Sequence, residues 1–207
     1  MFGGGQSFQL MRIFGIRIGA SPSWFVVLFV FIYLMSEQFK NVLDGSSTQA
    51  YLVAVAAVFL FFASIVLHEL GHAVVARRLG IGISGIDLWF FGGIAKMTSD
   101  STSPGTEFKI AAAGPLVTLG IVGLCTGLVA AISGDPVLDV ILFASNVHIS
   151  PGLALLGFLA FINGVVFVFN MIPAFPLDGG RIARAAIWRR TGDRNRATLA
   201  TGRSGQA

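Results

Sequence analysis

The sequence predicts an all-α polytopic membrane protein with about four transmembrane helices and short β-strands at its cytosolic face. Three observations support this class: the composition, four long uncharged runs, and the placement of the cations. The 207-residue chain is 55% hydrophobic and only 12% charged, and its mean hydropathy is +0.81. A soluble domain of this length could not bury so much apolar surface, and a single cysteine excludes a disulfide scaffold within the chain.

Four uncharged runs are long enough to cross the hydrocarbon core, which requires about 20 apolar residues. They comprise residues 18–36, 45–67, 110–134 and 140–177. The last run is too long for one helix, and Pro151 and Pro173 bound the part that we expect to be helical. The first run is expected to be retained rather than cleaved as a signal peptide, because no small-x-small site follows it.

The cations predict how these helices are oriented. Lys40 lies in the first connection, and the other 13 of the 14 Lys and Arg residues lie in the N-terminal segment, the second connection and the C-terminal tail. By the positive-inside rule both termini are cytosolic, in a multi-pass protein of a prokaryotic cell membrane. Because these cations flank apolar runs, the net charge of +4 indicates lipid head groups and the bilayer as partners, and no nucleic acid.

Two segments at the cytosolic side are expected to be short strands. Residues 8–19 and 81–97 mix β-branched and aromatic residues with closely spaced glycines, and Gly92-Gly93 is expected to form a turn. The predicted organisation is an N-terminal segment with a short strand (residues 1–19), a transmembrane core (residues 20–190) and a flexible basic tail (residues 191–207).

An HExxH motif, His68-Glu69-Leu70-Gly71-His72, lies in an apolar stretch. Residues i and i+4 share a helix face, so both imidazoles can bind one zinc ion while Glu69 can act on a metal-bound water. A cluster in which these three side chains merely satisfy one another is the alternative. Ionisable residues are costly inside a membrane and usually serve a function, which favours the metal site.

A third ligand must come from elsewhere in the chain, and Asp178 is the candidate. It follows Pro173 and Pro176 and precedes Gly179-Gly180, so the backbone there is irregular at membrane depth. Such backbone is tolerated where it is buried in protein or lines a watery cavity. The alternative is that Asp178 caps the helix expected at residues 179–190.

These motifs resemble the site-2 protease family of intramembrane zinc metalloproteases. The resemblance rests on the HExxH motif, on Ala76-Arg77-Arg78-Leu79-Gly80, on Phe91-Gly92-Gly93, on Ala112-Ala113-Gly114-Pro115-Leu116 and on residues 170–181. The connection at residues 80–109 is too short for the PDZ domain that many relatives insert. The chain is compatible with the CBS-containing subgroup, with the CBS region and its preceding helices cut off.

The resemblance implies that His68, His72 and Asp178 bind Zn2+ and that Glu69 is the general base. It implies that Asn170 lies near the metal and contacts the substrate carbonyl or its oxyanion. The alternative is that Asn170 bridges helices, and the functional role is preferred. The family often has an asparagine shortly after the Gly-Pro pair, where this chain has Val117-Thr118-Leu119. The residue that would make a polar substrate contact at this place in the family is therefore missing.

The expected function is hydrolysis of a peptide bond in or near a transmembrane helix of a membrane-anchored substrate protein. Its alternative is a metal-binding membrane transporter or channel, in which Glu69 would have no clear task. Gly123 and Gly127 form a GxxxG motif, which suits close packing between helices. Close packing within the chain is the preferred reading of this motif, and a homodimer is the alternative.

Overall fold

The computed structural model describes residues 7–43, 45–89, 92–144 and 149–203. Its four long helices are α1 (Pro22–Val42), α2 (Ser47–Arg78), α3 (Pro104–Ile132) and α5 (Pro151–Asn170). All four are long and apolar enough to cross a membrane, which confirms the predicted fold class. Even α5, with 20 residues, is about 30 Å long at ~1.5 Å per residue.

The helix bounds differ from the uncharged runs for two reasons. Residues 18–20 belong to a strand, so the first helix begins later, at Pro22, where the missing N–H of proline costs nothing. The second helix does not stop where the charges begin. It carries His68, Glu69 and His72 without interruption and ends at Arg78.

Four strands form one sheet in the order β1-β2-β3-β4. Their bounds are β1 (Phe8–Ile13), β2 (Ile16–Ala20), β3 (Ile83–Trp89) and β4 (Gly92–Met97). The outer pairs are antiparallel, whereas β2 and β3 are parallel and are connected through α1 and α2. The two predicted strand segments are thus confirmed, and β1 and β4 are the sheet edges.

The turns of the two hairpins lie at Phe14-Gly15 and before Gly92, and the second differs from the prediction. Phe14 and Gly15 both have positive φ, 51° and 76°, as the two central residues of a type I′ hairpin turn require. The expected Gly92-Gly93 turn is wrong, because both glycines lie within β4, where Gly92 pairs with Trp89. The connection itself is residues 90–91, which lie outside the described residues.

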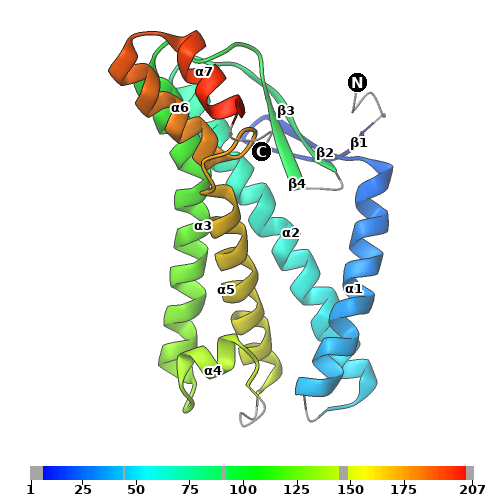
Figure 1. Cartoon of the computed structure of the whole chain (residues 1–207). Coiled ribbons are helices and arrows are strands. Elements are labelled where there is room, and N and C mark those ends of the chain that lie inside the picture. Colours follow the sequence, from blue (N-terminus) through cyan, green and yellow to red (C-terminus); the bar gives the residue numbers. More distant parts are fainter. Residues whose placement is uncertain (1–6, 44, 90–91, 145–148, 204–207) are drawn as a thin grey trace.

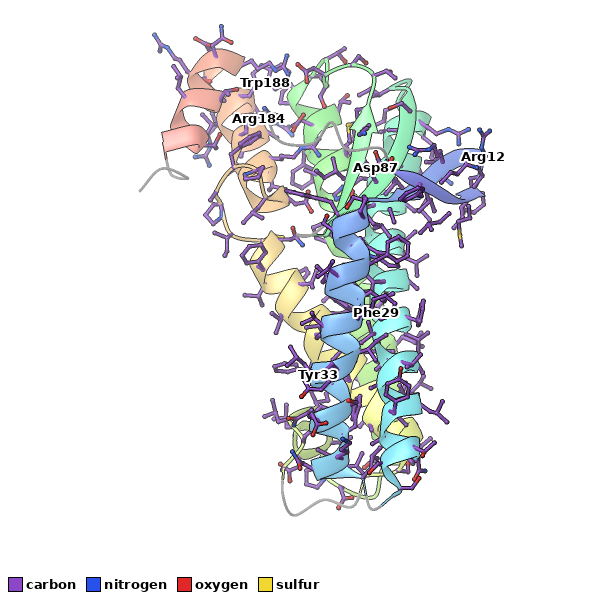
Figure 2. The ribbon with its side chains drawn as sticks, turned by 90° about the vertical axis from the view of Figure 1, so that its right-hand side faces the viewer. Arg12, Phe29, Tyr33, Asp87, Arg184 and Trp188 are labelled. Carbon is purple, nitrogen blue, oxygen red and sulfur yellow. The ribbon has the colours of Figure 1, made fainter. Side chains whose placement is uncertain are left out.

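The helices and the sheet are arranged as a bundle with one capped end (Figure 1). The sheet and the helices α6 (Asp178–Thr191) and α7 (Arg194–Arg203) gather at one end, here called the sheet end, and the short α4 (Val137–Ile141) lies at the other. Helix α1 packs against α2, and its Phe31 and Phe39 rings contact Phe158 of α5, whereas α3 packs against both α2 and α5. The outer faces are apolar, as at Phe29 and Tyr33 of α1, which are more than 60% exposed (Figure 2).

Two expectations need revision. Within the tail that was expected to be flexible, Arg194–Arg203 form α7, which packs on α6 and begins where Asp193 Oδ1 accepts hydrogen bonds from the backbone of Asn195 and Arg196. The GxxxG motif does not serve close packing within the described chain. A methyl group placed on Gly123 or Gly127 would meet nothing within 4 Å.

Candidate metal centre

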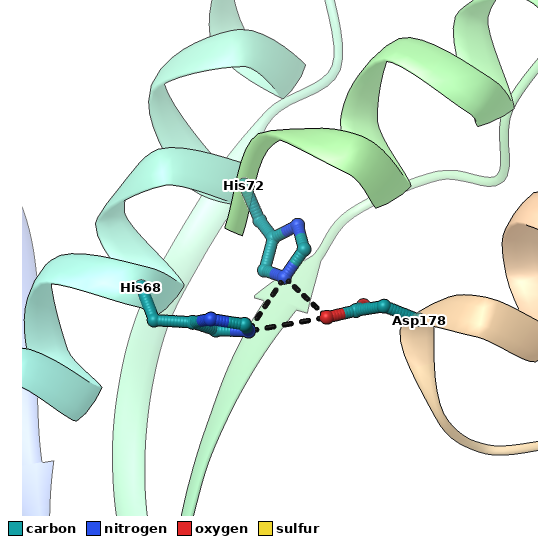
Figure 3. A group of neighbouring side chains, drawn as sticks. All are labelled: His68, His72 and Asp178. Carbon is teal, nitrogen blue, oxygen red and sulfur yellow. Dashed lines mark hydrogen bonds and ion pairs between the residues drawn. The ribbon is translucent and has the colours of Figure 1, made fainter. Parts of the chain in front are cut away.

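Three side chains from two distant segments converge near the sheet end of the bundle (Figure 3). His68 and His72 lie one turn apart on α2, and Asp178 is the first residue of α6. The Oδ2 atom of Asp178 lies 3.1 Å from Nε2 of each histidine, and the two Nε2 atoms are 3.2 Å apart. All three residues are buried. The structure therefore brings the three predicted ligands together.

The spacing of these three atoms fits a zinc ion. Donors bound at about 2.0–2.1 Å in tetrahedral geometry are about 3.3 Å from one another. The observed separations of 3.1–3.2 Å agree with that value. Gly114 on α3 keeps the space beside them open, because a Cβ there would lie 2.7 Å from Nε2 of His68 and still closer to His72. The cluster can thus hold one metal ion and leave a fourth position free.

The outer nitrogen of each imidazole is held by α3. His72 Nδ1 lies 2.7 Å from the carbonyl oxygen of Ile110, which can only accept a hydrogen bond, so Nδ1 carries the proton. His68 Nδ1 lies 2.8 Å from Oγ1 of Thr118, and the same tautomer there leaves Nε2 with a free electron pair. Partners of this kind orient metal-binding imidazoles and increase their basicity.

Sequence reasoning missed Thr118, which is 1% exposed. The residue was noted only because the family often has an asparagine in this region, and no partner was predicted for it. The available signal was a hydroxyl in an apolar run, four residues after Gly114 and so on the same face of the helix.

Glu69 is oriented by the sheet. Its Oε2 accepts a hydrogen bond of 3.1 Å from the backbone N–H of Ala95 on β4. Gly93, two residues earlier, lies so close that a Cβ there would be 2.6 Å from Cγ of Glu69. The edge strand thus fixes the carboxylate that follows the first histidine.

Asp178 does not cap the helix that it begins. The N-cap residue of α6 is Leu177, and no side chain makes a capping hydrogen bond. Gly180 lets the first turn of α6 lie directly on the backbone of Ala174, where a Cβ would be only 2.5 Å away.

A buried ion pair ties α6 to α3. Oε1 of Glu107 accepts hydrogen bonds from Nε of Arg181 at 3.0 Å and from the guanidinium of Arg184 at 2.6 Å. Glu107 is 1% exposed, so hydrogen bonds from two arginines replace those that water would make with this carboxylate. Sequence reasoning missed this pair as well, since no local pattern links residues more than 70 positions apart.

Asn170, the predicted contact for the substrate carbonyl, lies at the end of α5. Its side-chain amide donates to the carbonyl oxygen of Val166, one turn earlier, at 3.1 Å. The side chain lines the same cavity as the three converging residues but makes no hydrogen bond with them. Its expected role therefore stays a prediction.

A cavity of about 1170 Å³ leads from the cluster into the bundle. Its walls come from α1, α2, β4, α5 and the segment before α6, and they are mostly apolar. Polar side chains among the lining include Glu69, Asn163 and Asn170. An apolar segment thus has a route to the polar residues.

The sequence is similar to known proteins over most of its length. It matches peptidase family M50 over residues 56–203. A zinc metalloprotease of Methanocaldococcus jannaschii is 36% identical over 186 residues, which are 90% of this chain and 47% of that protein. A protein of Mycobacterium tuberculosis, provisionally named zinc metalloprotease Rip3, is 31% identical over 97% of this chain and 49% of its own length.

The fold is similar as well. The solved structure of a site-2 protease from Methanocaldococcus jannaschii superposes with a TM-score of 0.58 and 31% identity, covering 95% of this chain and 78% of that chain. This chain spans about half the length of the curated relatives that it matches.

Proposed function

The chain belongs to peptidase family M50, the site-2 protease family, and from this premise we propose that it hydrolyses a peptide bond in or near a transmembrane helix of a membrane-anchored protein. The observation that carries the proposal is the convergence of three donor atoms 3.1–3.2 Å apart beside Glu69, at the end of an apolar cavity. The relatives named above are metalloproteases, and they lend no support to a transporter or channel.

In this proposal His68, His72 and Asp178 hold Zn2+. Zinc, when bound, lowers the pKa of a coordinated water to about 7 and polarises a peptide carbonyl. The chain contributes the open position that Gly114 leaves beside the imidazoles, and it holds Nδ1 of each ring on α3 so that both Nε2 atoms stay available.

Glu69 is proposed as the general base. One of its carboxylate oxygens accepts the N–H of Ala95, which leaves the other free to take a proton from the attacking water and deliver it to the leaving amine. Asn170, on the wall of the same cavity, is proposed to contact the substrate carbonyl.

The substrate is proposed to reach the site between α1 and α5. These helices line the cavity on facing sides, and the ring contacts between them, from Phe31 and Phe39 to Phe158, lie nearer the α4 end than the metal centre does. The peptide bonds of a helical substrate are protected by their own hydrogen bonds, so the segment must unwind. The edge strand β4 lines the cavity, and we propose that it pairs with the unwound segment.

We also propose that the sheet end faces the cytosol of a prokaryotic cell. Arg12, Arg78 and Lys109 lie at this end, and most other cations do too, as the positive-inside rule requires for the cytosolic side. A homodimer remains a proposal that rests on the GxxxG motif alone.

The decisive experiment compares wild type with Glu69→Gln in liposomes that contain single-span reporter proteins. We expect wild type to cleave a reporter and the variant to lose at least 100-fold in rate, because general bases contribute about 10²–10⁴-fold. Bound zinc, measured in the same samples, should be equal in the two proteins. Equal cleavage by both proteins would end the proposal.

A further inference from the structure

A second, smaller groove lies on the outside of the bundle, between the two helices that surround the metal centre. It has a volume of about 380 Å³ and only apolar or glycine lining. Leu67, Gly71 and Val74 line it on α2, Ala113 and Leu116 line it on α3, and Phe14 lies at its sheet end. It is distinct from the large cavity, whose lining shares none of these residues.

The groove lies within the membrane-spanning part of both helices. Leu67 and Leu116 are 48% and 65% exposed, as lipid-facing residues are. Its sheet end is fixed by the hairpin, because Arg77 donates a hydrogen bond of 2.6 Å to the carbonyl oxygen of Phe14. Figure 2 shows this hairpin, with Arg12 labelled, projecting sideways from the end of the bundle.

Both walls of the groove end in a cation. Arg78 follows Val74 by four residues on α2, and Lys109 precedes Ala113 by four residues on α3, so each continues its wall by one turn toward the sheet end. Both side chains are exposed. Neither makes an ion pair or a hydrogen bond with any residue in the described part of the chain.

We propose that this groove binds an anionic phospholipid, with an acyl chain between α2 and α3 and the phosphate between Arg78 and Lys109. The two cations lie at the end of the spanning helices, where head groups are, and the apolar lining lies where acyl chains are. An apolar slot that ends in two cations without a partner among the described residues matches an amphiphile with a negative head. A free anion would leave the slot unfilled.

The proposed lipid would lie directly behind the metal centre. Gly71 and Ala113 line the groove, and each immediately precedes a residue of the centre, His72 and Gly114. The two helices already approach closely here, since a Cβ on Gly71 would lie 2.9 Å from Val117. A lipid in the groove would therefore brace the same helix pair that holds the imidazoles. The proposal does not depend on proteolysis.

Lipid binding to the purified full chain in detergent tests it, with native mass spectrometry as the readout. Dioleoyl phosphatidylglycerol and dioleoyl phosphatidylcholine have the same chains and differ in charge. We expect tighter binding of the anionic lipid, and we expect Arg78→Gln with Lys109→Gln to weaken it by roughly fivefold for each cation. The matched control is Arg189→Gln with Arg190→Gln, which removes two exposed cations from the last turn of α6.

Filling the groove separates the lipid from a soluble phosphate. Val74→Trp should weaken binding of both lipids, whereas Leu124→Trp, on an exposed part of α3 outside the groove, should not. The proposal fails if the anionic lipid binds equally to wild type and to the Arg78, Lys109 variant, or if the α6 control loses as much. It also fails if Val74→Trp binds like wild type. Thermal unfolding of each variant checks that it is folded.

Discussion

The hydroxyl of Thr118 lies 2.8 Å from Nδ1 of His68, on the side of the ring opposite the three converging donor atoms. This contact joins α3 to α2 in the buried interior and holds the His68 ring by its outer nitrogen. The proposed metal site uses the other nitrogen, so we expect Thr118 to affect how tightly the ion is held without contacting it.

Replacing Thr118 by valine keeps the shape of the side chain and removes the hydroxyl. We expect zinc affinity to fall about 10- to 100-fold, the usual effect of losing a partner of a metal-binding histidine. Competition with a fluorescent chelator measures the affinity. Thr126→Val, two turns further along α3, is the control. Unchanged affinity in Thr118→Val would show that His68 needs no such partner.

A methyl group at Gly114 should eject the metal. Its Cβ would lie 2.7 Å from Nε2 of His68 and against the ring of His72, so neither imidazole could keep its position. We expect Gly114→Ala to contain little zinc and to be inactive. Gly120→Ala changes the same helix by the same atom where nothing lies within 4 Å, and it should bind zinc like wild type. Zinc content by mass spectrometry distinguishes the two variants, and equal content would refute the geometry.

Breaking the buried ion pair at Glu107 should destabilise the protein. In Glu107→Gln, Arg181 and Arg184 keep their charges without the carboxylate, and loss of one partner of a buried pair costs about 3–5 kcal/mol. Thermal unfolding in detergent should show a lower Tm than wild type. Glu37→Gln, which removes an exposed carboxylate paired with Lys40, should change stability by about 1 kcal/mol or less. Similar Tm values for the two variants would contradict this expectation.

Asp87 should make the stability of the sheet depend on pH. Burial works to raise its pKa, but Lys96 and Arg17 on the neighbouring strands outweigh burial and hold the pKa below its usual range. A lowered folded-state pKa stabilises the fold above the unfolded-state pKa of about 3.9, and this stabilisation is lost as the pH falls through the folded-state value. Asp87→Asn should therefore unfold more easily than wild type at pH 7.

Repeating the Asp87→Asn measurement at successively lower pH provides the check. The difference in Tm between the two proteins should shrink below about pH 4, as wild type takes up a proton at Asp87. A difference that stays constant down to pH 3 would mean that the ion pairs contribute nothing.

Local patterns carried much of the fold and the centre of the site. Apolar runs of about 20 residues predicted the helices, and the i, i+4 spacing of His68 and His72 predicted a shared face. Alternating β-branched residues and glycines predicted the strands, although the Gly92-Gly93 turn was misplaced by the same glycine rule.

Contacts between distant segments were beyond the sequence. The pairing of Glu107 with Arg181 depends on how α3 and α6 rotate about their axes, and no periodicity records that rotation. The same holds for Thr118, because its contact with His68 depends on how α3 packs against α2. The prediction that the GxxxG motif packs within the chain failed for the opposite reason, since a local pattern with a known use can face away from every described neighbour.

The hydrogen bond from β4 to Glu69 is donated by the backbone N–H of Ala95. Every amino acid except proline supplies that N–H, so residue 95 can be substituted without loss of the hydrogen bond to the Glu69 carboxylate. A survey of invariant positions would overlook this partner, and alanine scanning would pass over it too. Only a proline, or an ester in place of the amide, would reveal how much the base relies on it.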